Sequence, residues 1–133
     1  MGGALADVIQ LNANGSGVIT ASSNLTATSS ISLSSGTGDI SSISTNTTKL
    51  TVNTSGSASV QNSNPGTLTF TTSSTFVNID LRTDHDLFVS TPVNSSGNLV
   101  LMTTANSGSI DLASTASGKN VTISASTADN MVS

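Results

Sequence analysis

The residues whose types and spacing could support chemistry lie in one short segment, residues 80–86. Its ionisable side chains are Asp80, Arg82, Asp84, His85 and Asp86. Divalent cations such as Ca²⁺ take several oxygen ligands, and carboxylates supply them. Paired carboxylates also carry the acid and base steps of glycoside hydrolysis. The three carboxylates, Asp80, Asp84 and Asp86, are therefore the candidate metal ligands of this chain.

The order of residues in this segment also has a simpler interpretation. In Ile79–Asp80–Leu81–Arg82 the charges alternate with aliphatic residues, as they do on the outward face of a strand. The remaining acids then form a charged turn before the next strand. One His without a placed nucleophile or second acid makes no catalytic triad. We expect a solvated turn rather than a site, and no catalytic residue, no cofactor and no enzymatic activity.

The element that must position these side chains is a strand that is used repeatedly. Residues 97–117 contain one pattern twice: a Gly, an aliphatic–any–aliphatic triplet, and a small polar tail. Leu99 and Leu101 fill the first triplet, and Ile110 and Leu112 fill the second. A spacing of two between apolar residues predicts a strand with one buried face.

Such triplets recur from residue 49 onwards with a longer period. Ala58, Ile79, Leu99 and Val121 are separated by 21, 20 and 22 residues. The intervening series Leu50, Leu68, Leu87 and Ile110 has steps of 18, 19 and 23. A third, short strand fits at residues 75–77 and 91–93.

A period near 20 in a strand-rich chain predicts an all-β fold, a parallel β-solenoid (β-helix) of about six coils of about 20 residues. We expect residues 1–30 to form irregular first coils or a cap, and residues 31–133 to form the solenoid repeats. A β-sandwich is the rival fold, but it usually has aromatic core anchors.

The composition narrows the classes of partner. Charged residues make up 8% of the chain, the formal net charge is −4, and Lys and Arg number only three. A nucleic-acid-binding protein needs several Lys or Arg side chains to neutralise phosphates. No apolar run in this sequence approaches the length that spans a bilayer. We therefore expect neither nucleic-acid binding nor membrane insertion. Without Cys, the chain has no disulfide framework.

Asparagines mark one corner of the expected coil. Asn78, Asn98 and Asn120 each come directly before a triplet, at steps of 20 and 22. Stacked in register, their side-chain amides would form a hydrogen-bonded ladder. Chance alignment in an Asn-rich chain is the alternative.

Thr-x-Thr motifs raise the possibility of an ice-binding surface, which needs the motif once per coil at one position. They occur at Thr26/Thr28, Thr45/Thr47 and Thr67/Thr69/Thr71 and then lapse. An ice- or polysaccharide-binding solenoid is thus one alternative function, and a carbohydrate-active β-helix enzyme is a second.

The run GNLVLMTTANSGSIDLASTASGKNVTIS resembles the repeats of filamentous-haemagglutinin-like exoproteins of two-partner secretion, and similar repeats occur in other type V secreted adhesins. The match covers about residues 31–127. The resemblance implies a right-handed parallel β-helix within an extracellular stalk that serves adhesion and virulence. It also implies a secreted, bacterial cell-surface location, an outer-membrane transporter for the full-length protein, and a host or cell-surface glycan or protein as partner.

This sequence departs from the pattern of that family in one feature. Its amino-terminal secretion domain carries Asn-Pro motifs, whereas this chain has only Asn64–Pro65–Gly66, which is typical of a turn. The chain therefore resembles a slice of the repeat region. Neither end reads as a polar cap, so we expect either an excised fragment or end-to-end self-association through open strand edges.

Overall fold

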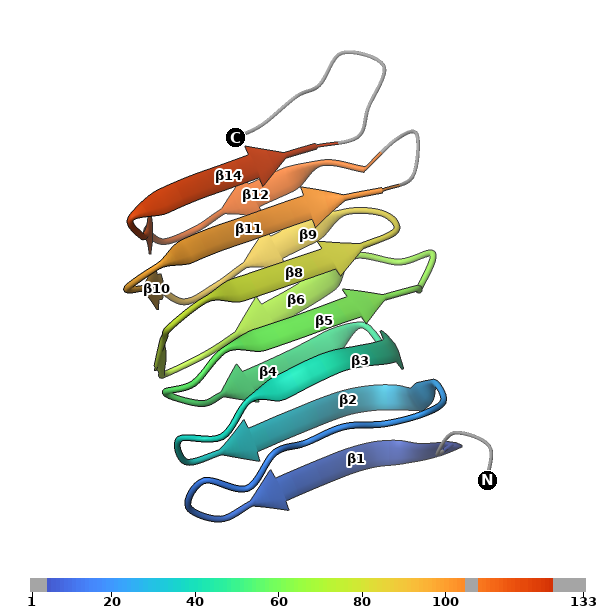
Figure 1. Ribbon diagram of the computed structural model, residues 1–133. Helices are drawn as coiled ribbons and strands as arrows, with labels where there is room; N and C mark the ends of the chain where they lie inside the picture. Colours follow the sequence, from blue (N-terminus) through green and yellow to red (C-terminus); the bar gives the residue numbers. More distant parts are fainter. Residues whose placement is uncertain (1–4, 105–107, 126–133) are drawn as a thin grey trace.

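The protein is a right-handed parallel β-solenoid of about six turns with a spacing of about 20 residues. The computed structural model describes residues 5–104 and 108–125. In Figure 1 the strands nearest the viewer run to the right and those behind them run to the left while the chain climbs, which is a right-handed winding. The first and last described strands lie at opposite ends of the stack. The described residues form strands and turns without a helix.

Fourteen strands build the coils. Their bounds are β1 Leu5–Ala13, β2 Leu25–Ser35, β3 Ile40–Asn46, β4 Lys49–Asn53, β5 Ala58–Asn62, β6 Leu68–Thr71, β7 Thr75–Phe76, β8 Ile79–Thr83, β9 Leu87–Val89, β10 Val93–Ser95, β11 Asn98–Thr103, β12 Ile110–Leu112, β13 Ala116–Ser117 and β14 Asn120–Ser124.

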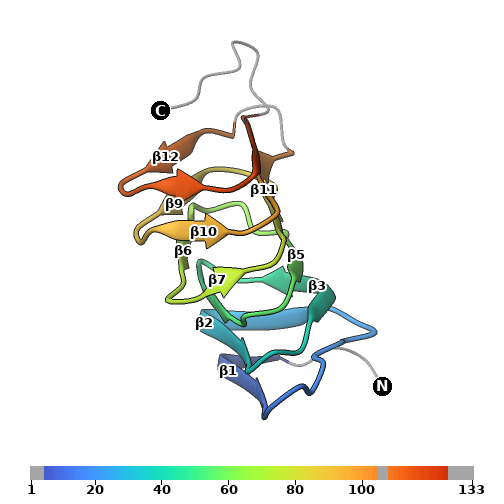
Figure 2. The same cartoon turned by 60° about the vertical axis from the view of Figure 1, so that its left-hand side comes forward.

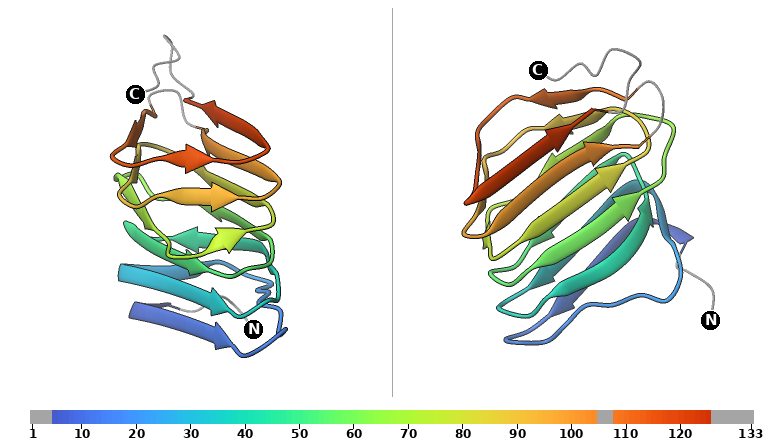
Figure 3. Two further views of the ribbon diagram at one scale, coloured as in Figure 1. Left: turned by 90° about the vertical axis from the view of Figure 1, so that its left-hand side faces the viewer. Right: turned by 45° about the horizontal axis from the view of Figure 1, so that its top comes forward.

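These strands form three faces of the rod, and the strands within each face run parallel to one another. The front sheet contains β3, β5, β8, β11 and β14; the rear sheet contains β1, β2, β4, β6, β9 and β12; the side sheet contains β7, β10 and β13. The start of β2 also pairs with β3, so the front and rear sheets are hydrogen-bonded into one. Figure 2 shows the side sheet closing the coil, and Figure 3 shows it face on in its left panel. The short third strand expected in each coil is therefore present from β7 onwards, although β10 begins at Val93, two residues later than the expected segment 91–93.

The front sheet carries the apolar column that the 20-residue period predicts. Ala58 pairs with Ile79, Ile79 with Leu99, and Leu99 with Val121. The column continues below through Ile40, which bridges to Ile19. Each member points inward because alternate residues of a strand face opposite sides.

The rear sheet corrects one step of the predicted register. The sequence series places Leu50 beside Leu68, whereas the structure pairs Leu50 with Phe70. The step is thus 20 residues, not 18. A shift of two residues keeps the same side chains inward, so hydrophobic alternation alone cannot detect it. The next two steps, Leu68 to Leu87 to Ile110, agree with the prediction.

The lower coils contain the irregular part of the winding. A bulge in β3 lies between Ile40 and Ile43, both of which are buried, and Ser42 takes a positive φ of 52° there. Residues 18–21 contribute only the isolated bridge at Ile19. The expected boundary at residue 30 lies inside β2, which pairs along β1 on one side and with β4 on the other.

Candidate functional site

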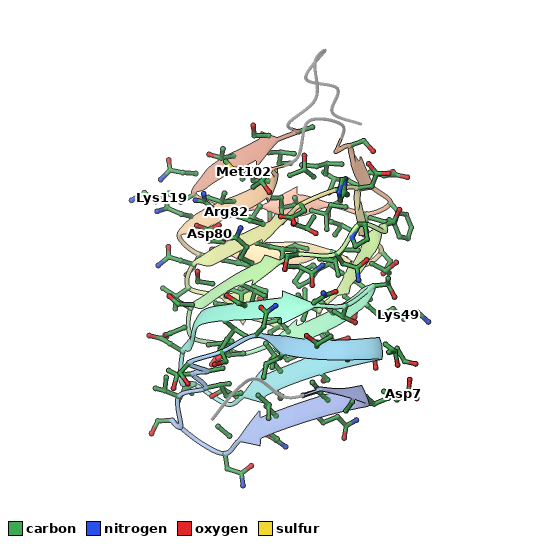
Figure 4. All side chains as sticks on the ribbon, turned by 90° about the vertical axis from the view of Figure 1, so that its right-hand side faces the viewer. Asp7, Lys49, Asp80, Arg82, Met102 and Lys119 are labelled. Carbon is green, nitrogen blue, oxygen red and sulfur yellow. The ribbon has the colours of Figure 1, made fainter. Side chains whose placement is uncertain are left out.

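The outward side of the front sheet carries Asp80, Arg82 and the corner asparagines Asn78, Asn98 and Asn120. Register places them in three rows that run up the rod. These rows are Ser57, Asn78, Asn98, Asn120; Ser59, Asp80, Val100, Thr122; and Gln61, Arg82, Met102, Ser124. Figure 4 shows Asp80, Arg82 and Met102 on one side of the rod and Lys49 on the opposite side. We call this surface the outer front face.

The charged pair at its centre lies within one strand. Arg82 Nε donates to Asp80 Oδ1 at 2.9 Å, and Arg82 Nη2 donates to Asp80 Oδ2 at 3.1 Å. This bidentate contact raises the pKa of Arg82, first through the hydrogen bond and then through the charge of Asp80. The side chains of Arg82 and Asp80 are 44% and 37% exposed, so solvent screens the pair. Asp80 is therefore held by Arg82 on the surface of the sheet.

The two other candidate metal ligands lie in the corner after β8, where each contacts the coil above. Thr104 Oγ1 donates to Asp84 Oδ1 at 3.2 Å. The backbone N–H of Ser109 donates to Asp86 Oδ1 at 2.9 Å. Within the described residues no group of three or more His, Cys, Asp or Glu side chains is placed to hold a metal ion. The structure thus does not bring Asp84 and Asp86 together with Asp80 as a cation site.

The three corner asparagines do lie in one column. Asn120 Nδ2 donates to Asn98 Oδ1 at 2.9 Å, and the Asn98 backbone N–H donates to Asn78 Oδ1 at 2.9 Å. Asn78 Nδ2 in turn donates to Ser57 Oγ at 3.4 Å. The side chains thus connect four successive coils at one corner, although only the upper contact joins two side-chain amides.

A shallow furrow crosses the lower half of the outer front face. It consists of two adjoining hollows of about 350 and 280 Å³, both lined by Ser42, Ser59 and Asp80. Asn78 and Asn98 line the first hollow, and Gln61 and Arg82 line the second. Two residues with short side chains line both hollows: Ser59 on β5, and Ser42 within the bulge of β3. The furrow therefore presents hydroxyl, amide, carboxylate and guanidinium groups along a single path.

A buried polar column was missed by the sequence reasoning. Thr45, Asn62, Thr83 and Thr103 occupy the third inward position of successive front strands, and all are fully buried. The sequence does carry a signal, because each follows two residues after an aliphatic position at the coil period. In the described part of the chain, every buried side-chain nitrogen and oxygen has a hydrogen-bond partner. These residues stabilise a corner and are not available to solvent.

The Thr-x-Thr motifs do not form one surface. Thr45 and Thr47 are buried, so this motif points into the rod. On the rear sheet Thr69 and Thr71 point outward, and Thr71 Oγ1 lies 2.7 Å from Thr51 Oγ1. The motifs at residues 45–47 and 67–71 therefore face in different directions and cannot make a single repeated ice-binding array.

Comparisons with protein-family models, with curated proteins and with solved structures found no match to this chain. Among the described residues there is also no helix with the length and apolar character needed to cross a membrane.

Proposed function

We propose that this chain is a structural and adhesive segment of a secreted bacterial surface exoprotein, in which the stacked coils act as a rigid stalk or fibre. One observation carries this proposal: parallel ladders join every coil to the next, from β1 to β14, with apolar columns packed between the sheets. Load applied along such a rod is shared by hydrogen bonds and packed side chains across each coil. The secreted location and the outer-membrane transporter rest on the repeat resemblance.

Pulling the chain by its two ends tests the stalk role. A folded rod resists extension and then lengthens in discrete steps, towards the roughly 450 Å contour expected for 133 residues at about 3.4 Å each. A flexible Gly/Ser linker of equal length, spliced between the same handles, is the matched control and should extend smoothly from low force. If this chain extended as smoothly as the linker, the stalk proposal would fail.

We propose that the adhesive contact is made by the furrow on the outer front face, with a hydroxyl-rich glycan as the ligand. The exposed Asp80–Arg82 pair supplies acceptors and donors side by side, and Ser59 leaves room above the sheet. We propose a binding role without bond cleavage: Arg82 holds Asp80 in a bidentate contact, and the remaining lone pairs of the exposed carboxylate can accept hydrogen bonds from a glycan. This arrangement favours recognition over the carbohydrate-active alternative.

A glycan array with two matched variants tests the adhesive contact. Ser59→Tyr fills the furrow, whereas Thr69→Tyr adds the same ring to the outward side of the rear sheet. We expect Ser59→Tyr to lose binding to the glycans that the wild type recognises. Thr69→Tyr should still bind them. Equal binding by the wild type and Ser59→Tyr would show that the furrow is not the contact surface.

A further inference from the structure

The turn that follows β1 places a free side-chain amide beside a free backbone nitrogen. The side chain of Asn14 is exposed and makes no hydrogen bond within the described part of the chain. The next residue, Gly15, has a positive φ of 61°, and its N–H makes no hydrogen bond there either. A Cβ added to Gly15 would meet no atom within 4 Å, so the space around this residue is open.

The same turn is fixed to the coil above through its carbonyl oxygens. The Gly15 carbonyl accepts the Thr37 N–H at 2.7 Å, and the Gly17 carbonyl accepts the hydroxyl of Ser35 at 2.6 Å. The Gly17 N–H donates to the Asn14 carbonyl at 3.1 Å and closes the turn. These bonds keep Asn14 and Gly15 in place, but they engage neither the Asn14 side chain nor the Gly15 nitrogen.

The other asparagines of the described chain lack this combination. Most have side chains held in hydrogen bonds: Asn46, Asn53, Asn62, Asn64, Asn78, Asn94, Asn98 and Asn120. Asn12 and Asn24 have no such bond, but the residue after each carries a side chain, which shields its backbone nitrogen. An Asn followed by Gly occurs once in the sequence, at Asn14. Gly leaves its own nitrogen accessible because it has no Cβ.

We propose that Asn14 is a site of spontaneous covalent modification in the folded protein. A base takes the proton of the Gly15 N–H, the nitrogen forms a bond to Asn14 Cγ, and the side-chain nitrogen leaves as ammonia. Water then opens the resulting cyclic imide. Cleavage of the bond from nitrogen to Cγ leaves an ordinary aspartate. Cleavage of the bond from nitrogen to the Asn14 backbone carbonyl carbon leaves an isoaspartyl linkage, in which the main chain runs through the former side chain.

The isoaspartyl product should loosen the first coil. It adds a carbon to the main chain between Asn14 and Gly15, and it adds a carboxylate. The turns approach closely at this point, because a Cβ on Gly36 would lie 2.6 Å from the Gly15 carbonyl oxygen. A longer backbone cannot keep this oxygen both beneath Gly36 and bonded to the Thr37 N–H. The coils above keep their own hydrogen bonds.

Incubation of the full chain in mildly alkaline buffer, followed by peptide mapping with mass spectrometry, tests the proposal. Among the asparagines that the structure describes, Asn14 should convert first, with loss of ammonia and an acidic shift of the isoelectric point. Conversion should be slower in mildly acidic buffer, because less base is present to take the Gly15 proton. Asn14→Gln is the matched control, since its longer side chain would have to close a larger ring, and residue 14 should then stay unchanged. Asn24 is the internal reference for an exposed, unbonded amide.

Unfolding separates the effect of the structure from that of the sequence. In concentrated urea Asn62 and Asn94 lose their hydrogen bonds, and they should convert faster than they do in the folded protein. An Asn14 that converts in urea but stays intact in the folded protein would overturn the proposal. So would a folded protein in which Asn24, Asn62 and Asn94 convert as fast as Asn14.

Amide hydrogen exchange tests the consequence for the first coil. Exchange at the Thr37 N–H should accelerate in the isoaspartyl form, because its acceptor is displaced. The N–H of Ser55, which donates to the Gly36 carbonyl at 3.0 Å one coil higher, is the matched control and should exchange as before. Equal exchange at Thr37 before and after modification would contradict the loosening of this coil.

Discussion

The side-chain amide of Asn62 forms hydrogen bonds with both the backbone N–H and the backbone carbonyl of Thr47, one coil below. Asn62 Oδ1 accepts the Thr47 N–H at 3.1 Å, and Asn62 Nδ2 donates to the Thr47 carbonyl at 3.0 Å. Asn62 Oδ1 also accepts from Thr45 Oγ1 at 2.8 Å. The amide thus replaces a strand at the corner between the front and rear sheets, where the backbone of the coil turns away.

Replacing Asn62 should therefore destabilise the rod strongly. Asn62→Ala leaves the N–H and carbonyl of Thr47 without partners in a buried corner, and we expect a loss of about 3 kcal/mol of unfolding free energy. Urea denaturation measures it. Gln61→Ala, one residue away and exposed, should change stability by less than about 0.5 kcal/mol. Similar midpoints for the two variants would contradict the assigned role of Asn62.

The close approach of adjacent turns makes Gly38 sensitive to any side chain. A Cβ on Gly38 would overlap the carbonyl oxygen of Gly17, which belongs to the turn below. We expect Gly38→Ala to cost about 1–3 kcal/mol, as overpacking does. Gly66→Ala is the control, since its Cβ would lie 3.2 Å from a side-chain oxygen. Thermal melts compare the two, and a stable Gly38→Ala protein would mean that the turns lie further apart.

Two phenylalanines on neighbouring rear strands differ in burial, so replacing each one compares core packing with surface contact. Phe70 is fully buried, whereas Phe88, which pairs with Thr69, points outward and is half-buried. Phe70→Ala leaves a cavity in the bore and should cost about 3–5 kcal/mol. Phe88→Ala should cost much less, because it opens no cavity. Chemical denaturation of both variants decides the point, and equal losses would contradict the inward assignment of Phe70.

The carboxylate of Asp7, on β1, should make the stability of the fold depend on pH in the acid range. Hydrogen bonds from Ser29 and then Thr28 to its carboxylate lower the pKa of Asp7 below its ordinary value of 3.8. A lowered folded-state pKa stabilises the protein above the unfolded pKa, and this contribution is lost as pH falls through the folded value. An NMR titration should show Asp7 ionising at lower pH than in the variant that combines Thr28→Ala with Ser29→Ala. Coincident titration curves would contradict these hydrogen bonds.

The repeat of the front sheet could be predicted from the sequence because the first two inward positions of its strands are aliphatic in successive coils. The pairing of Leu50 with Phe70 could not, because a slip of two residues preserves the inward pattern. The separation of Asp84 and Asp86 from Asp80 depends on how the corner bonds to the coil above. The closeness of these residues along the sequence does not indicate their separation in space.

The furrow was also beyond sequence reasoning. It depends on the bulge at Ser42 and on the register that sets Ser59 beside Asp80. A single Ser with positive φ has no distinct sequence pattern in a chain this rich in Ser. By contrast, the corner asparagines recur at the coil period, so their column could be located from the spacing of Asn78, Asn98 and Asn120 alone.

The most direct test of the account is the distance between the two ends of the rod. The chain lacks Cys, so cysteines introduced at Asn14 and Lys119 can carry spin labels without side reactions. These corners lie in the first and last coils, and a strand spacing of about 4.8 Å predicts an axial separation of roughly 25 Å. Double electron–electron resonance should give one narrow distribution near that distance, broadened only by the labels. A broad distribution centred far beyond it would contradict a rigid stack of coils.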